Sequence, residues 1–134
     1  SLLPNVLARQ TARQADMQEA WQIDADGLVT EGAATNAWIV DADGVLRTRP
    51  ATHDILNGIV RQVLLDLAAQ QNLPVSEKPF SLDEAKAAKE CFSTASTMSV
   101  FPVVSIDGCT IGDGKPGPIA SALADAYDKA ALRH

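Results

Sequence analysis

Aromatic residues, cysteines and clusters of positive charge are all scarce in this sequence. Only 4% of the 134 residues are aromatic although 46% are hydrophobic, so we expect an aliphatic core of helices packed on a sheet. The formal net charge is −6 and no basic run occurs, which argues against nucleic acid and anionic membranes as partners. No apolar run approaches the roughly 20 residues that span a bilayer.

The cysteines, Cys91 and Cys109, do not have the spacing of a metal or redox motif. His53 and His134 lie far from them in sequence, so no metal site is predicted. We interpret both cysteines as reduced thiols of a cytoplasmic protein. The first residues, 1–4, have neither an initiator Met nor the layout of a signal peptide, and we expect that further residues precede them.

The first half of the sequence predicts a helix followed by an antiparallel meander. Apolar residues between Leu3 and about Ala20 fall near helical spacing. Two Asp-Ala-Asp-Gly sequences, at 24–27 and 41–44, are typical of tight turns between short apolar runs. The expected strands are Ala20–Ile23, Leu28–Glu31, Ala37–Val40 and Val45–Thr48.

The second half predicts helices that alternate with strands. We expect a strongly amphipathic helix at Ile59–Gln71, a short helix whose capping box is Ser81 and Glu84, and a last helix opened by Pro118. The expected strands are 75–80 at a sheet edge, 91–94 and 100–106. These elements together predict one mixed α/β domain.

Three short motifs could bind a ligand. Gly58 precedes the Ile59–Gln71 helix, and free N–H groups at the positive end of a helix bind phosphate. The Ser93–Thr97 turn offers hydroxyls and amides to an anion. Glu31 follows an apolar strand, where a buried carboxylate needs a cationic or hydrogen-bonding partner. Taken alone, each motif is more typical of a steric glycine, an ordinary Ser/Thr turn or a surface hairpin residue.

The loop at 112–117 is rich in glycine. Its spacing matches neither a Walker loop nor a dinucleotide fingerprint, so we interpret the loop as structural. Lys115 within it is interpreted as a solvated charge.

In combination, the motifs resemble those of class IV (branched-chain/D-amino-acid, fold type IV) pyridoxal-phosphate aminotransferases, and the D-amino-acid aminotransferase group most closely. The similarity extends over essentially the whole chain. The matching stretches, in order, are Leu2–Ala8, Thr30–Asn36, Ile55–Arg61, Phe92–Thr97 with Phe101–Val104, Ile106–Gly108 and Gly112–Gly117. The resemblance implies the large C-terminal domain of such an enzyme, a mixed α+β fold with an antiparallel-rich sheet or pseudo-barrel and packed helices.

The resemblance also implies pyridoxal 5′-phosphate as cofactor and gives each motif a role. One acid would pair with the pyridine nitrogen and keep it protonated, one leucine would pack against the ring, and amides at the helix start and hydroxyls of the Ser/Thr turn would bind the phosphate. The implied cofactor-binding residues are Glu31, Leu56, Gly58, Ile59, Val60, Ser96 and Thr97, with Ala33 and Ala34 on the substrate side.

Some of these residues depart from the family pattern. Val60 stands where D-amino-acid aminotransferases typically have Thr, and Ser96 stands where Thr is usual. Ala33 and Ala34 replace serines that are often found there. These changes are compatible with cofactor binding and leave the identity of the substrate open.

The resemblance places the Schiff-base lysine a few residues before Leu2–Asn5, and therefore upstream of Ser1. The chain is accordingly expected to be the C-terminal cofactor-binding domain, 1–134, without the N-terminal domain and without the catalytic lysine. The lysines that the chain does contain lie outside the expected position: Lys78, Lys86, Lys89, Lys115 and Lys129.

For the complete protein, the resemblance implies an enzyme that moves an amino group between a D-amino or branched-chain amino acid and a 2-oxo acid. An aminodeoxychorismate lyase or an R-selective amine transaminase of the same fold is an alternative that the sequence does not separate. An alternative of a different class is a catalytically silent truncated domain. Family members are usually dimers, so we expect a cytoplasmic homodimer that binds neither nucleic acid nor membrane.

Overall fold

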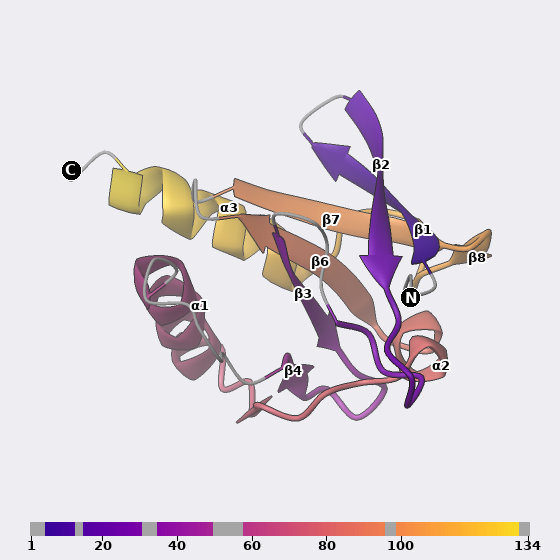
Figure 1. The fold of residues 1–134 in the computed structure, drawn as a ribbon. Coiled ribbons are helices and arrows are strands. Elements are labelled where there is room, and N and C mark those ends of the chain that lie inside the picture. The colour runs from indigo at the N-terminus through magenta and orange to yellow at the C-terminus, as the bar shows by residue number, and fades with distance from the viewer. Residues whose placement is uncertain (1–4, 13–14, 31–34, 50–57, 96–98, 132–134) are drawn as a thin grey trace.

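The computed structural model describes residues 5–12, 15–30, 35–49, 58–95 and 99–131. Figure 1 shows a central sheet with helices against it. The strands are β1 (Asn5–Ala12), β2 (Ala15–Gln22), β3 (Thr35–Val40), β4 (Leu46–Arg47), β5 (Val75–Ser76), β6 (Glu90–Ala95), β7 (Ser99–Ile106) and β8 (Cys109–Thr110), and the helices are α1 (Gly58–Gln70), α2 (Leu82–Lys86) and α3 (Pro118–Ala131).

The sheet has eight strands in the order β2-β1-β7-β6-β3-β4-β5, with β8 paired to β7. Its paired strands are antiparallel except for β4 and β5, which are parallel. This architecture confirms the predicted mixed fold with an antiparallel-rich sheet. Among the described helices, none is both long and apolar enough to cross a membrane.

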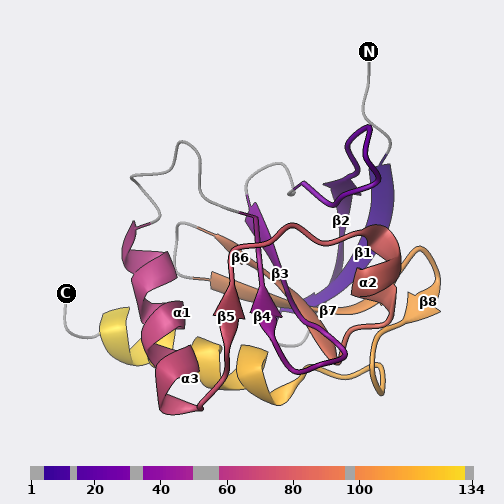
Figure 2. The same cartoon turned by 90° about the horizontal axis from the view of Figure 1, so that it is seen from below.

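The two faces of the sheet bury two separate hydrophobic clusters. Because side chains alternate along a strand, Trp38 and Phe92 point to the face that α1 and α3 cover, where their rings stack at a centroid distance of 6.3 Å. Ile39 and Cys91 point to the other face, which α2 covers. Figure 2 shows α1 and α3 side by side, away from α2. The central strands are thus buried on both faces.

The predicted helix between Leu3 and Ala20 is wrong, because this segment forms the hairpin β1–β2. Its register runs from Asn5 opposite Gln22 to Ala12 opposite Ala15, and β1 also pairs with β7. Apolar residues are too sparse here for a helical stripe to decide the conformation. Pairing on both sides of β1 therefore outweighs the local preference.

The other predicted elements are present, with three strands shorter than predicted, one of which is Val45–Thr48, reduced to β4. Both Asp-Ala-Asp-Gly turns form, with Gly27 and Gly44 at φ +79° and +81°, and α1, the capping box of α2 and the Pro118 start of α3 are present. The predicted strand at 28–31 is reduced to isolated bridges. The predicted edge strand at 75–80 is reduced to β5, which does lie at the edge of the sheet.

The start of α3 is held by a buried carboxylate from the sheet. Glu90, the first residue of β6, is 5% exposed, and its two oxygens accept hydrogen bonds from the N–H groups of Ile119 and Ala120, each at 3.0 Å. A negative charge there is stabilised by the positive end of the helix. A Cβ atom at Gly117 would overlap this carboxylate. The loop at 112–117 can therefore approach β6 this closely only with glycine at position 117.

A second buried charge ties β4 to α2. Arg47 is 6% exposed and donates hydrogen bonds to the Glu84 carboxylate and to the carbonyl oxygen of Pro79. A carboxylate oxygen of Asp41 lies 3.6 Å from the Arg47 guanidinium. The hydrogen bond from Arg47 is the main reason that the pKa of Glu84 lies below its ordinary value. Because Glu84 is also the capping-box residue of α2, this one carboxylate serves both contacts.

We expect Gly117→Ala to lower the free energy of unfolding by about 1–3 kcal/mol, because the added methyl group displaces the Glu90 carboxylate. The same substitution in a Glu90→Ala background should have little effect, since the atoms it overlaps are gone. Urea unfolding of the single and double variants measures this coupling. An equal loss in both backgrounds would show that the carboxylate does not set the requirement for glycine.

The Arg47–Glu84 pair predicts a pH-dependent contribution to stability. Glu84→Gln retains the capping box but should lower the free energy of unfolding by about 0.5–1 kcal/mol at neutral pH, a small effect because half-exposed Glu84 is screened by solvent. The folded-state pKa lies below the ordinary 4.5, so the wild-type advantage is fully present above 4.5 and is lost as pH falls through the lowered value. Unfolding curves at a series of pH values test this, and an advantage that persists in strong acid would contradict it.

Candidate functional site

The predicted site residues divide into two groups. Gly58, Ile59 and Val60 are described, and they form the first turn of α1, as the sequence predicted. The others lie outside the described residues, so their roles stay predictions: Glu31, Ala33, Ala34, Leu56, Ser96 and Thr97.

The described strand ends next to these motifs lie together in the sheet. Thr35, at the start of β3, is the partner of Ala95 at the end of β6. Ala95 is also the partner of Ser99 at the start of β7. The chain therefore enters the Thr30–Asn36 motif and the Ser93–Thr97 motif from adjacent strands at the same end of the sheet (Figure 1).

Trp38 connects these strands to α1. Its indole N–H donates a hydrogen bond to the Thr94 hydroxyl at 2.9 Å, within the buried interior. The guanidinium of Arg61, in the first turn of α1, lies 5.3 Å from the centroid of the Trp38 ring, which is within the range of a cation–π interaction. Strands β3 and β6 and helix α1, each of which adjoins one of the three predicted motifs, are thus in contact through the Trp38 side chain.

The first turn of α1 is also held from the other side, by α3. Val60 is 3% exposed, and its carbonyl oxygen accepts a hydrogen bond of 2.9 Å from the Tyr127 hydroxyl. Burial raises the pKa of Tyr127, so the phenol remains a neutral donor at physiological pH. The sequence reasoning missed Tyr127, because a tyrosine on an amphipathic helix gives no local sign of a partner 67 residues away.

The chemistry of the α1 start fits an anion such as phosphate. The first turn of α1 contains no acidic residue, whereas α2 begins with Asp83 and Glu84 and the start of α3 is filled by Glu90. The first N–H groups of a helix lack partners within the helix and carry partial positive charge. A phosphate group is a suitable acceptor for such a donor set.

Cys91 does not supply a reactive thiol in this structure. Both cysteines are free, with Cys91 buried and Cys109 partly exposed. Burial raises the pKa of Cys91, and its thiol donates to the Ala85 carbonyl at 3.3 Å. A thiol held protonated in this way is a poor nucleophile. Within the described ranges, no group of three His, Cys, Asp or Glu side chains is arranged as a metal site.

All five lysines of the sequence lie in the described part of the chain. Lys86 is partly buried and lies 3.9 Å from the Asp107 carboxylate. The remaining lysines, Lys78, Lys89, Lys115 and Lys129, are exposed. None of them lies in the first turn of α1 or at the strand ends described above.

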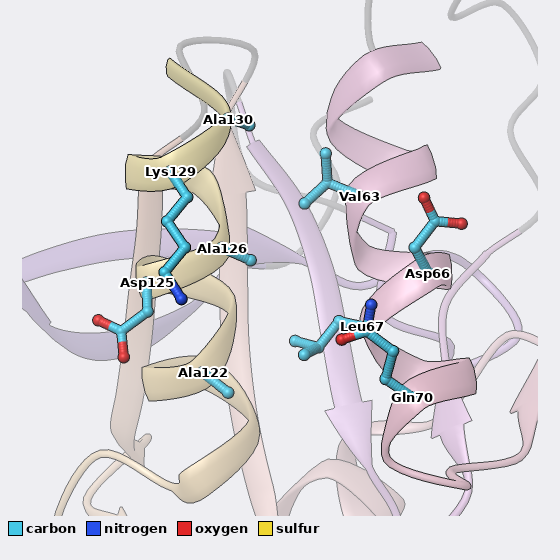
Figure 3. Close-up of a pocket in the computed structure, with 9 residues that line it drawn as sticks. All are labelled: Val63, Asp66, Leu67, Gln70, Ala122, Asp125, Ala126, Lys129 and Ala130. Atoms are coloured by element: carbon cyan, nitrogen blue, oxygen red, sulfur yellow. The ribbon is translucent and has the colours of Figure 1, made fainter. Parts of the chain in front are cut away.

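A cavity that the sequence did not predict lies between α1 and α3. Its volume is about 520 Å³, and Figure 3 shows alanines of α3 facing Val63 and Leu67 of α1. The small side chains explain the space, because they recur at four-residue intervals on one face of α3. The cavity is lined by Val63, Asp66, Leu67, Gln70, Ala122, Asp125, Ala126, Lys129 and Ala130, and therefore by none of the predicted cofactor residues.

Comparison with known proteins supports the resemblance seen in the sequence. The family model of amino-transferase class IV matches residues 1–106. A D-alanine aminotransferase from Bacillus licheniformis is 42% identical over 132 residues, which cover 98% of this chain and 46% of that protein.

Solved structures of this kind are similar in fold as well. The branched-chain amino acid aminotransferase from Escherichia coli matches with a TM-score of 0.71 and 34% identity, over 83% of this chain and 37% of that one. The branched-chain aminotransferase from the thermophilic archaeon Thermoproteus uzoniensis, solved with norvaline, matches with a TM-score of 0.72 and 34% identity, over 86% of this chain and 37% of that one. The chain thus spans less than half the length of each of these proteins.

Proposed function

The chain belongs to the class IV aminotransferase family, and from this premise we propose that it is the cofactor-binding part of a pyridoxal 5′-phosphate-dependent aminotransferase. The complete enzyme would transfer an amino group between an amino acid and a 2-oxo acid. In this proposal, residues 1–134 form the C-terminal cofactor-binding domain. The N-terminal domain and the reactive lysine belong to the part of the enzyme outside these residues.

The observation that best supports this proposal is the contact of three motif-bearing elements through Trp38. The indole hydrogen bond to Thr94 and the Arg61 guanidinium over the ring hold β3, β6 and the start of α1 in fixed relation. A cofactor with a phosphate at one end and a ring nitrogen at the other needs protein groups at set separations. A rigid support for those groups is what a preorganised site requires.

The proposed roles of the residues follow from their chemistry. The N–H groups of Ile59 and Val60, next to Gly58, bind the phosphate at the positive end of α1, and Ser96 and Thr97 complete the phosphate site with a hydroxyl and amides. The Glu31 carboxylate pairs with the pyridine nitrogen, Leu56 packs on the ring, and Ala33 and Ala34 border the substrate.

When bound, the cofactor supplies an electron sink for the bonding electrons of the substrate Cα–H bond. The protein must keep the ring nitrogen protonated for this to happen, and a carboxylate at Glu31 stabilises that proton. Ala33 and Ala34 lack the hydroxyl groups of the serines that are often found there, so the substrate side is less polar. In this proposal, Glu31 therefore controls the protonation of the ring, and Ala33 and Ala34 accommodate the substrate.

We propose a D-amino acid as the amino donor, because curated relatives at 42% identity are D-alanine aminotransferases. A branched-chain L-amino acid is the second candidate, favoured by the solved structures of similar fold.

We also propose that the complete enzyme is a homodimer of the cytoplasm. The free cysteines fit a reducing compartment, and the resemblance to a family whose members are usually dimers supports the homodimer.

We expect Glu31→Gln in the complete enzyme to reduce kcat by about 100-fold, because a neutral amide no longer stabilises the proton on the ring nitrogen. The free energy of unfolding should change by less than about 1 kcal/mol. Asp26→Asn, which removes an exposed carboxylate from the turn that precedes Glu31 in the sequence, is the matched control and should retain activity. Steady-state kinetics and urea unfolding measure the two effects, and a fully active Glu31→Gln enzyme would refute the role.

The proposed function is tested on the complete enzyme by amino transfer and by covalent labelling. With pyridoxal 5′-phosphate present, D-alanine and 2-oxoglutarate should yield pyruvate, and faster transfer from L-leucine would favour the second candidate. Borohydride reduction followed by peptide mass analysis should then find the cofactor on a lysine outside residues 1–134. A label on any lysine within this chain, such as Lys129, would contradict the assignment, and failure to retain the cofactor would favour a catalytically silent protein.

A further inference from the structure

We propose that Tyr127, on α3, is a positioning residue for the phosphate-binding turn of α1. The inference rests on the proposed function, since it assigns Tyr127 a task toward the same phosphate site. Tyr127 does not touch the cofactor in this proposal. It acts through the backbone of Val60, whose carbonyl oxygen lies 2.9 Å from the Tyr127 hydroxyl.

The Tyr127 hydroxyl is not needed to satisfy the helix. In an α-helix the carbonyl of Val60 already accepts the N–H of Leu64, four residues on, and the oxygen has a second lone pair for the phenol. The ring alone would fill the space between the helices, because Tyr127 is 1% exposed and packs in the apolar cluster with Leu64. The hydroxyl is therefore an added contact with one specific peptide group.

That peptide group belongs to the turn that presents the proposed phosphate donors. The N–H groups of Ile59 and Val60 precede the Val60 carbonyl by one residue or less, so a shift of this carbonyl shifts them too. On the sheet side, the turn is held by Arg61 over Trp38. On the α3 side it is held by Tyr127. Contacts from two directions fix the position of the turn relative to the sheet and α3, whereas a single contact would allow the turn to rotate about it.

The support behind Tyr127 leads back to the strand next to the second phosphate motif. The start of α3 is hydrogen-bonded to Glu90, and Glu90 begins β6, the strand that ends at Ala95 beside Ser96 and Thr97. The path from Glu90 through α3 and Tyr127 to Val60 thus connects β6 with the turn of α1 that presents the proposed phosphate donors. A binding group must be held within about 0.5 Å of its working position, and this path supplies that constraint.

The test uses the complete enzyme with its cofactor removed, and Tyr127→Phe, which keeps the ring and deletes only the hydroxyl. Titration with pyridoxal 5′-phosphate should give a Kd about tenfold above wild type, the lower end of the loss seen when a hydrogen-bond partner of a metal ligand is removed. Titration with pyridoxal, which has no phosphate, should give the same Kd for both proteins. This difference between the two ligands is the readout that a loss of general stability does not produce.

Ile106→Val is the matched control. It removes one methyl-sized group from a fully buried side chain in the cluster on the opposite face of the sheet, so it lowers stability without touching α1 or α3. Its Kd for pyridoxal 5′-phosphate should remain that of wild type, while its urea midpoint falls to a similar extent as that of Tyr127→Phe.

Two results would overturn the positioning role. One is an unchanged Kd for pyridoxal 5′-phosphate in Tyr127→Phe, and the other is an equal weakening for pyridoxal and for the phosphorylated cofactor. In both, the wild-type enzyme still binds its cofactor and transfers amino groups, so the proposed function stands. If the wild-type enzyme binds no pyridoxal 5′-phosphate, the proposed function fails and the role of Tyr127 fails with it.

Discussion

Strand β6 is buried on both faces and yet contains three buried polar side chains, and the arrangement of the molecule depends on how these are satisfied. Glu90 accepts two N–H groups of α3. Ser93 accepts the indole N–H of Trp21 at 3.2 Å on one face, and Thr94 accepts that of Trp38 on the other. A buried polar group without a partner is costly, so these contacts favour one register of β6 against β3 and one placement of β6 relative to β2 and α3. Apolar side chains of the same size would not discriminate among alternative registers in this way.

The same electrostatic feature, the positive end of a helix, is used differently at α1 and α3. The protein fills the start of α3 with its own carboxylate, and Gly117 is the residue that allows this close approach. The glycine-rich loop is therefore explained by the protein interior, and a ligand is not required. The first turn of α1 has no acid of its own, and contacts hold its carbonyl and its arginine side chain instead. A turn that is fixed in place, and that carries no acidic residue of its own, is well suited to an anionic ligand.

Local rules predicted the elements whose signals are local. The two Asp-Ala-Asp-Gly turns, the capping box at Ser81 and Glu84 and the helix α1 each depend on residues within one or two turns of chain. The hairpin β1–β2 was missed because its conformation depends on pairing with β7, about 95 residues away in sequence, and not on its own sparse apolar residues. Glu90 gave no sign of burial, since a charged residue at a strand end is usually exposed. Tyr127 and the cavity between α1 and α3 follow only from tertiary packing. The start of the candidate site at Gly58 was predicted, whereas the contacts that hold it in place were not.

The contacts that support the candidate site involve few of the side chains proposed to meet the ligand. Trp38, Thr94, Arg61 and Tyr127 act on backbone and on each other, and Val60 contributes its carbonyl, with its side chain buried in the core. Val60 departs from the family pattern in its side chain, whereas the support uses only its backbone carbonyl. Such a division explains how relatives named for D-alanine and for branched-chain amino acids share one scaffold, because binding specificity resides in segments attached to a rigid framework. In the proposed function, this framework would hold the cofactor-binding groups, and the choice of amino acid would fall to the residues attached to it.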